Sequence, residues 1–211
     1  MNTSAPTIGL FGSSHISHYP LDIFHTYNIH PIIISSSPKN IAAIIKQDTV
    51  HHTIKYIQSH NITLDKILIL IGANDIGTLT PTQIAQGIIH IANSFNNINI
   101  QPIIVPLFNR HKPNSISKTQ YNTDKNKINK HLRLHYKRQH QYNIIKIANL
   151  RLEEDGVHIT KQGYRTLTKA IAYHIKKSNI PKHIIQLPPG HYKDHHNNEE
   201  IIIKHIVEKK L

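Results

Sequence analysis

The sequence predicts an α/β domain with three layers, in which helices cover both faces of a parallel sheet. Short apolar runs alternate along the chain with longer amphipathic stretches, which is the pattern of repeated strand and helix units. Signals for helix starts stand between the apolar runs. The chain of 211 residues is long enough for one domain with a substantial core and short for two.

Five apolar runs are the predicted strands. Each has about five or six residues, the usual length of a buried strand. Apolar residues dominate these runs, which is typical of parallel strands that are covered on both faces. The runs are Thr7–Phe11, His30–Ser35, Lys66–Ile71, Gln101–Pro106 and Asn143–Ala148. Five strands are enough for a three-layer domain.

Helices are expected between these strands. Two of them start with a hydroxyl residue that can cap a helix directly before a proline, at Ser37 and at Thr80. The first is expected to run towards Ile57 with a break near Asp48, and the second carries an apolar stripe at Ile84, Ile88 and Ile91. Two further helices are expected over Tyr121–His140 and from Thr160 through Ile175.

The pattern lapses after Ser178, where prolines and a histidine-rich stretch follow. We therefore expect one domain over residues 1–178, then a linker and a short tail helix over 179–211. The tail histidines could bind a metal, but a solvated cluster is the favoured interpretation, and no metal or cofactor is expected. No apolar run approaches the roughly 18 to 20 residues that span a bilayer, and Met1–Pro6 lacks the features of a secretory signal. These observations predict an intracellular, cytoplasmic protein without a membrane span.

The composition limits the chemistry that the protein can perform. Cysteine is absent, which excludes disulfides, zinc–thiolate sites and a cysteine nucleophile. Any nucleophile is therefore a hydroxyl, a carboxylate or an amine. The 25 Lys and Arg residues against 12 Asp and Glu give a net charge of +13, which suggests a polyanionic partner. A coding strand poor in guanine would produce the same bias without any such partner, and this alternative stays open.

Candidate catalytic residues follow the predicted strands, where ligands bind in an open parallel sheet. Ser14 stands in the turn after the first strand and can act as a nucleophile. Asp155 lies three residues ahead of His158 and can fix its tautomer, which leaves Nε2 as a base. Asn74 follows Gly72 in a turn, and its amide can donate to an oxyanion together with the Ser14 N–H.

In this order, the segments Gly12–Ser14, Gly72–Asp75 and Asp155–His158 resemble the motifs of the SGNH, or GDSL-type, serine hydrolases. The resemblance covers roughly residues 7–175. It implies a flavodoxin-like fold with a five-stranded parallel sheet of order 2-1-3-4-5. It also implies a serine esterase that cleaves a small or medium acyl ester through an acyl-enzyme. In such an enzyme Ser14, His158 and Asp155 form the triad, Asn74 donates to the oxyanion and Gly72 shapes its loop.

Two positions depart from the family pattern. Ser13 stands where the family has aspartate, which makes it a rival nucleophile, although the spacing from Gly12 favours Ser14. The glycine that donates to the oxyanion after the second strand is missing, and the backbone N–H of a serine such as Ser36 can take its place. An inactive protein with a hydrolase fold is therefore the alternative to an active esterase.

A basic stretch between Arg110 and His140 is the candidate surface for nucleic acid or another polyanion. Its cations are Lys112, Lys118, Lys125, Lys127, Lys130, Arg133, Lys137 and Arg138. An ordinary solvated helix face is the favoured interpretation of this stretch. Residues 12–15 and 72–76 also resemble the esterase domains found beside nucleic-acid-binding proteins of LINE-type retrotransposons. That context would make the alternative an accessory protein that binds nucleic acid.

Overall fold

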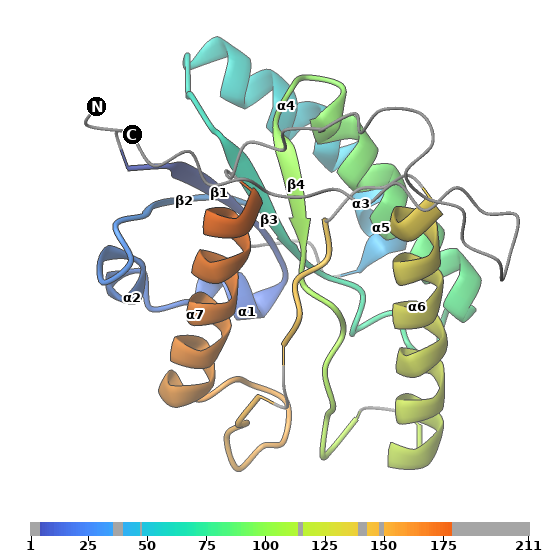
Figure 1. Ribbon diagram of the computed structural model, residues 1–211. Helices are drawn as coiled ribbons and strands as arrows, with labels where there is room; N and C mark the ends of the chain where they lie inside the picture. The colour runs from blue at the N-terminus through green and yellow to red at the C-terminus, as the bar shows by residue number, and fades with distance from the viewer. Residues whose placement is uncertain are drawn as a thin grey trace, which may run out of the picture. The chain divides into compact units, whose positions relative to one another are not determined.

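The computed structural model (Figure 1) describes residues 5–35, 40–46, 48–113, 116–138, 143–147 and 150–178. The chain divides into two compact units, residues 1–172 and 173–211. The second unit is described only at the end of α7, so the predicted boundary after residue 178 and the predicted tail helix stay predictions. The elements are β1 (Thr7–Gly12), α1 (Ser14–Ser17), α2 (Asp22–His25), β2 (His30–Ser35), α3 (Ile41–Lys46), α4 (Thr49–Ser59), β3 (Lys66–Leu70), α5 (Pro81–Asn96), β4 (Gln101–Ile104), α6 (Lys118–Arg138) and α7 (Lys161–Ser178).

The first unit contains a parallel sheet of four strands in the order β2-β1-β3-β4. The prediction of a fifth strand over Asn143–Ala148 is wrong. Within the described part of this run, residues 143–147, Ile144 forms an isolated parallel bridge with Ile104, beside β4, and no strand; Ala148 lies outside the described residues. The physical reason is that β4 ends at Ile104. Backbone groups of a strand face its two neighbours alternately, so Val105 donates its N–H to Ile69 in β3 at 3.0 Å. The next residue that faces the side of Ile144 is Pro106, which has no N–H to extend the bridge into a strand.

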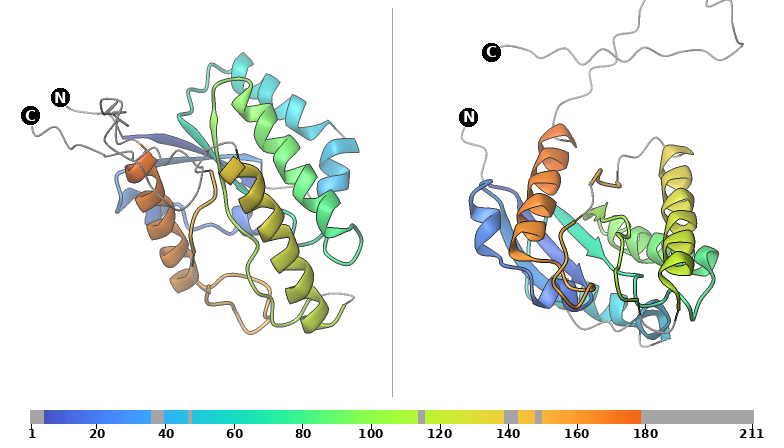
Figure 2. Two further views of the ribbon diagram at one scale, coloured as in Figure 1. Left: turned by 45° about the vertical axis from the view of Figure 1, so that its right-hand side comes forward. Right: turned by 90° about the horizontal axis from the view of Figure 1, so that it is seen from below.

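Side chains that alternate along the strands form a core on each face of the sheet. Phe11, Ile67 and Ile69 belong to an apolar cluster that is completed by residues of α3, α4, α5 and α6. Ile8 and Leu10, equally buried, point to the other face because successive side chains of a strand alternate. The helices α1 and α2, and the part of α7 that belongs to the first unit (residues 161–172), lie on that face (Figures 1 and 2). Helices on both faces confirm the predicted three layers.

The predicted starts of α5 and α7 are confirmed, whereas α6 begins at Lys118, three residues before the predicted Tyr121. Thr80 caps α5 in a capping box, because its Oγ1 accepts from the N–H of Gln83 at 3.3 Å while the Gln83 side chain accepts from the Thr80 N–H at 3.0 Å. The predicted break near Asp48 is confirmed, since Asp48 has a left-handed backbone (φ 49°) between α3 and α4. The cap predicted at Ser37 lies outside the described residues. In the described ranges, no helix is both long and apolar enough to cross a bilayer.

Candidate active site

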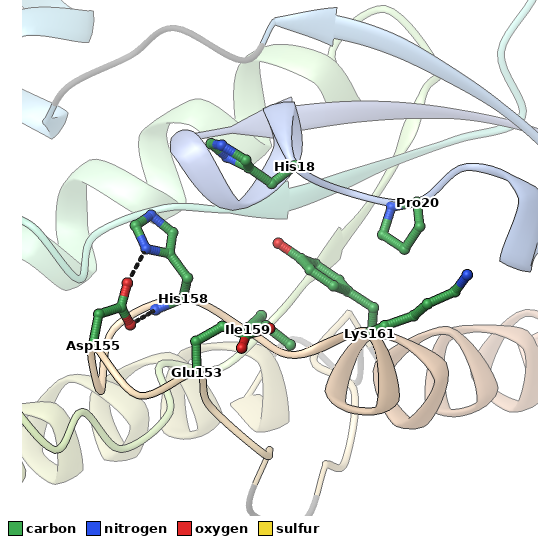
Figure 3. A pocket seen from close by; sticks show the side chains of 8 residues that line it. His18, Pro20, Glu153, Asp155, His158, Ile159 and Lys161 are labelled. Atoms are coloured by element: carbon green, nitrogen blue, oxygen red, sulfur yellow. Dashed lines mark hydrogen bonds and ion pairs between the residues drawn. The ribbon is translucent and has the colours of Figure 1, made fainter.

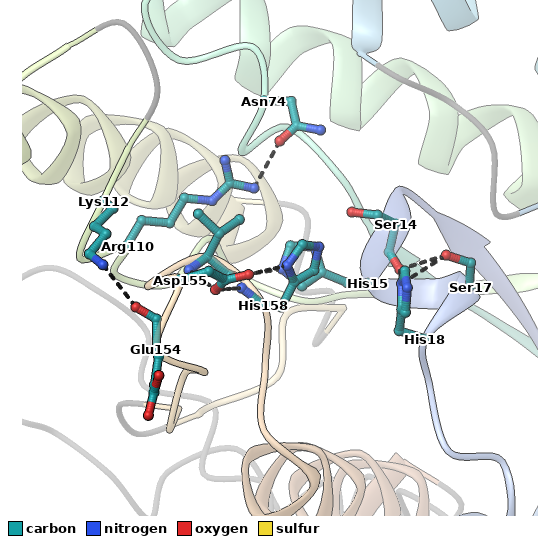
Figure 4. A network of polar contacts seen from close by, with 11 residues as sticks. Ser14, His15, Ser17, His18, Asn74, Arg110, Lys112, Glu154, Asp155 and His158 are labelled. Atoms are coloured by element: carbon teal, nitrogen blue, oxygen red, sulfur yellow. Dashed lines mark hydrogen bonds and ion pairs between the residues drawn. The ribbon is translucent and has the colours of Figure 1, made fainter.

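The carboxyl ends of β1 and β3 bring two of the three predicted segments to one edge of the sheet, and the loop before α7 joins them there (Figure 4). The turn after β3 depends on Gly72, whose φ of +104° is unfavourable for other residues. A Cβ at this position would also lie 3.1 Å from Ile88 and 3.2 Å from Ile84 in α5. Gly72 therefore shapes the loop that carries Asn74.

Asp155 and His158 form a hydrogen-bonded pair in the loop before α7. His158 Nδ1 donates to Asp155 Oδ2 at 2.5 Å, while Asp155 Oδ1 accepts from the N–H groups of Val157 and His158 at 2.8 and 2.9 Å. The hydrogen bond from His158, followed by the backbone hydrogen bonds, holds the pKa of Asp155 well below its usual range. Because Nδ1 donates to the carboxylate, Nε2 of the neutral ring is a proton acceptor.

Helix α1 and His18, the residue that follows it, lie against the ring of His158. The ring centroid of His158 lies 5.7 Å from that of His15 and 5.5 Å from that of His18. Ser14 is the first residue of α1 and is partly exposed. In the described part of the chain, no hydrogen bond joins the Ser14 hydroxyl to His158. The structure thus brings all three residues to the same edge without a closed Ser14–His158 contact.

Ser13 and His15 are buried and bonded to each other. Ser13 is 7% exposed, and its hydroxyl lies 3.3 Å from His15 Nδ1. His15 Nε2 donates to the Val157 carbonyl at 3.1 Å, so Nδ1 accepts from Ser13 in the neutral ring. Burial, the largest cause, lowers the pKa of His15 to about 4. His15 therefore links α1 to the Asp155–His158 loop as a neutral ring, and the buried Ser13 hydroxyl is bonded to this ring.

Asn74 is held by a residue that the sequence analysis did not single out. Arg110 Nη2 donates to Asn74 Oδ1 at 2.8 Å (Figure 4). Arg110 is only 4% exposed, and its guanidinium carbon lies 5.9 Å from the ring centroid of Tyr121. Burial lowers the pKa of Arg110 below its usual range. Sequence patterns grouped Arg110 with the basic stretch. Arg110 lies in the loop after β4, at the same edge of the sheet as Asn74, and this position could have indicated that it belongs to the site.

A cavity of about 410 Å³ lies beside His158 (Figure 3). His18, Pro20, Lys161 and Tyr164 line it together with the Asp155–His158 pair. Of the remaining predicted groups, Ser36 and the tail histidines lie outside the described residues. Within the described ranges, no three histidine or carboxylate side chains are grouped to hold a metal ion.

Comparisons with known proteins show which solved structures share the observed fold. No protein-family model matches the sequence, and no curated protein matches it. Solved structures do match. A protein from Slackia heliotrinireducens assigned to the SGNH hydrolases has a TM-score of 0.63 and 14% identity, covering 81% of this chain and 99% of its own. A GDSL-like lipase from Bacteroides thetaiotaomicron has a TM-score of 0.62 and 15% identity, covering 84% and 91%.

An aryl esterase from M. smegmatis, solved with an inhibitor bound, has a TM-score of 0.59 and 14% identity, covering 82% of this chain and 99% of its own. At these identities the likeness concerns the fold. Three short motifs in the sequence, at Gly12, Gly72 and Asp155, predict the same fold. This protein has the fold of the SGNH hydrolases.

Proposed function

We propose that the protein is a serine hydrolase that cleaves small or medium acyl esters through an acyl-enzyme. The observation that carries this proposal is the Asp155–His158 pair, whose imidazole lies against α1, the helix that begins with Ser14. Several solved proteins of the same fold are described as lipases or esterases, which supports the substrate class. The cavity beside His158 supports a small or medium substrate group.

In this proposal, Ser14 Oγ attacks the ester carbonyl while His158 Nε2 takes the hydroxyl proton. Asp155 stabilises the imidazolium through the 2.5 Å hydrogen bond. The Ser14 N–H and the Asn74 amide donate to the oxyanion, and a backbone N–H of Ser36 is a further expected donor. The tetrahedral intermediate collapses, and the alcohol leaves with the proton from His158. The same imidazole then activates the water that hydrolyses the acyl-enzyme.

The test is hydrolysis of p-nitrophenyl acetate and butyrate by the natural protein and by Ser14→Ala. Loss of the nucleophile lowers kcat by about 10³-fold or more in serine hydrolases. Ser59→Ala in α4 is the matched control, because Ser59 is exposed and its hydroxyl bonds local groups at the end of its own helix, the Tyr56 carbonyl at 3.1 Å and His60 Nδ1 at 3.0 Å. A p-nitrophenyl alkylphosphonate should modify the peptide that contains Ser14. Equal hydrolysis by Ser14→Ala and the natural protein overturns the proposal.

Ser13→Ala distinguishes the two adjacent serines. Its hydroxyl faces His15, so this substitution should reduce kcat much less than Ser14→Ala and should lower stability instead. The phosphonate should still modify the Ser13→Ala protein. Modification of Ser14→Ala at Ser13 would transfer the nucleophilic role to Ser13.

A second candidate function is polyanion binding through α6. The distribution of buried and exposed residues on this helix favours it. Tyr121, Ile128, Leu132 and Tyr136 are buried, whereas the solvent side of the helix carries exposed cations. These are Lys118, Lys127, Lys130, Arg133, Lys137 and Arg138. Asp124 is the single acidic residue of α6 and lies 3.8 Å from Lys127.

Salt dependence tests this second function. Binding of single-stranded RNA and DNA should weaken between about 50 and 200 mM salt, since each neutralised phosphate adds about 0.7 to the slope on logarithmic axes for single strands. Removing Lys130 and Arg133 together should reduce that slope. Binding that barely responds to salt excludes phosphate contacts by α6.

A further inference from the structure

Arg110 places a positive charge in the interior of the candidate site without a carboxylate to neutralise it. In the described part of the chain, no Asp or Glu oxygen lies within ion-pair distance of its guanidinium. Its Nε is buried without a hydrogen-bond partner. Asp155 is the carboxylate whose charge reaches Arg110, but its two oxygens already bond His158 and the loop backbone. A buried cation without a counter-charge is unfavourable, so its retention calls for an explanation.

The contact with Asn74 gives the amide a defined orientation. A guanidinium only donates hydrogen bonds, so the Asn74 atom that faces Arg110 is Oδ1. The Nδ2 group is then turned to the other side, and Figure 4 shows it on the side of Ser14. The two residues are 36 positions apart, and Arg110 comes from the loop after β4. Arg110 therefore holds the amide from behind, relative to Ser14.

We propose that Arg110 is a positioning residue for the oxyanion site: it fixes the Asn74 amide with Nδ2 towards Ser14, and its unneutralised charge strengthens the response of that amide to a developing oxyanion. This inference rests on the proposed ester hydrolysis. No carboxylate forms an ion pair with this charge in the described part of the free protein, and a carbonyl oxygen that becomes negative at the Asn74 amide interacts with it favourably. An interaction that improves only in the transition state raises kcat rather than substrate affinity.

A double-mutant cycle in kcat tests the proposal. Arg110→Met keeps similar length and volume but removes the charge and the donors, and it should lower kcat by about 10- to 100-fold with KM changed less than about threefold. Asn74→Ala removes the amide through which Arg110 acts. In the Asn74→Ala background, Arg110→Met should therefore cost less than about threefold. Arg165→Met, an exposed arginine of α7, is the matched control and should leave kcat unchanged.

Two results of the cycle overturn the proposal. Equal losses from Arg110→Met with and without the Asn74 amide would assign Arg110 a general structural role. A loss that falls on KM alone would assign it to substrate binding. Arg110→Lys, which keeps the charge but not the planar fork, should recover part of kcat. If Arg110→Met does not fold, Arg110→Lys in both backgrounds provides the same cycle.

A second measurement separates this proposal from the proposed function. The side-chain NH₂ resonances of Asn74, assigned by their loss in Asn74→Ala, should shift in Arg110→Met and remain in place in Arg165→Met. This NMR comparison needs no turnover. Absence of Ser14-dependent hydrolysis removes the proposed function, whereas unshifted Asn74 resonances in Arg110→Met remove the proposal for Arg110.

Discussion

The candidate site has an exposed half and a buried half, and the two hold their polar groups by different means. In the exposed half, the His158 and Asp155 side chains are 40% and 47% exposed, and their hydrogen bond spans three residues. In the buried half, Arg110 and His15 are 4% and 1% exposed. Their side chains bond partners 36 and 142 residues away, at Asn74 and Val157.

Because of this difference in surroundings, substitutions in the two halves should affect catalysis and stability differently. Water screens the interaction between Asp155 and His158. Substitutions in this exposed pair should therefore impair proton acceptance by His158 Nε2 with little effect on folding. The buried groups have exchanged water for protein partners, and each polar atom that loses its partner retains the cost of desolvation. We therefore expect substitutions in the exposed half to act on kcat and substitutions in the buried half to act on both kcat and unfolding.

Asp155→Asn should have the largest effect on catalysis. The asparagine amide can hold the wrong imidazole tautomer, and the corresponding change in another serine hydrolase costs about 10⁴-fold in kcat. The exposed position predicts a nearly unchanged melting temperature. Steady-state kinetics with p-nitrophenyl butyrate, together with thermal unfolding by circular dichroism, measure both quantities. A large fall in melting temperature would contradict the separation of the two halves.

His15 should make stability depend on pH. Its pKa is lowered from 6.5 in the unfolded chain to about 4 in the folded protein, so the unfolded state binds the proton first as the pH falls. Above about pH 6.5 both states are neutral, and stability is then lost progressively down to about pH 4. The loss attributable to this 1% exposed ring is about 3 kcal/mol. Urea unfolding at several values between about pH 7 and 4 measures it.

His15→Gln supplies the control for this pH dependence. Glutamine can donate to Val157 and accept from Ser13, but it does not titrate. The neighbouring titratable groups Arg110, His18 and His158 remain in the variant. The difference between the two proteins therefore isolates the contribution of His15. The free energy of unfolding of His15→Gln should change less between the same pH values than that of the natural protein. Parallel pH curves would show that His15 is already protonated or exposed in the folded protein.

The exposed half was predictable from sequence because its contacts are local. Asp155 and His158 are three residues apart. The start of α5, outside both halves, was predictable in the same way, from the hydroxyl residue ahead of Pro81. The buried half was not, because the pairing of Arg110 with Asn74 depends on how the loop after β4 approaches the turn after β3. Neither segment contains that information by itself.

The missing fifth strand has a similar origin. The apolar run from Asn143 has the composition of a strand, but strand formation requires a neighbour with unpaired backbone groups. β4 supplies only Ile104, whose N–H and carbonyl bond Asn143 and Ile145 at 2.6 and 3.1 Å. The predicted strand extends to Pro106, whereas β4 ends two residues earlier, at Ile104. Because β4 is shorter than predicted, the prediction of a fifth strand beside it also fails.

Gly156→Ala tests how the two halves are joined. Gly156 lies between Asp155 and His158, its carbonyl accepts from the N–H of His111 at 2.8 Å, and its φ is +67°. A Cβ would lie 2.8 Å from that of His111, next to Arg110. Left-handed strain alone costs about 1–2 kcal/mol. The substitution should lower the free energy of unfolding by about that amount and also lower kcat, as urea unfolding and kinetics measure. Unchanged kcat would mean that the halves move independently.

Thr80→Ala should have the smallest effect and provides a reference outside both halves. The Thr80 hydroxyl is an exposed, local contact like the Asp155–His158 pair, but it caps α5 and has no role in the proposed chemistry. Loss of such a cap costs about 1 kcal/mol. For a chain of this size that corresponds to a fall of about 2–4 °C in melting temperature, with kcat unchanged. Thr80→Ser keeps the cap and should behave as the natural protein. A fall in kcat in Thr80→Ala would show that exposed local contacts far from His158 also control the site.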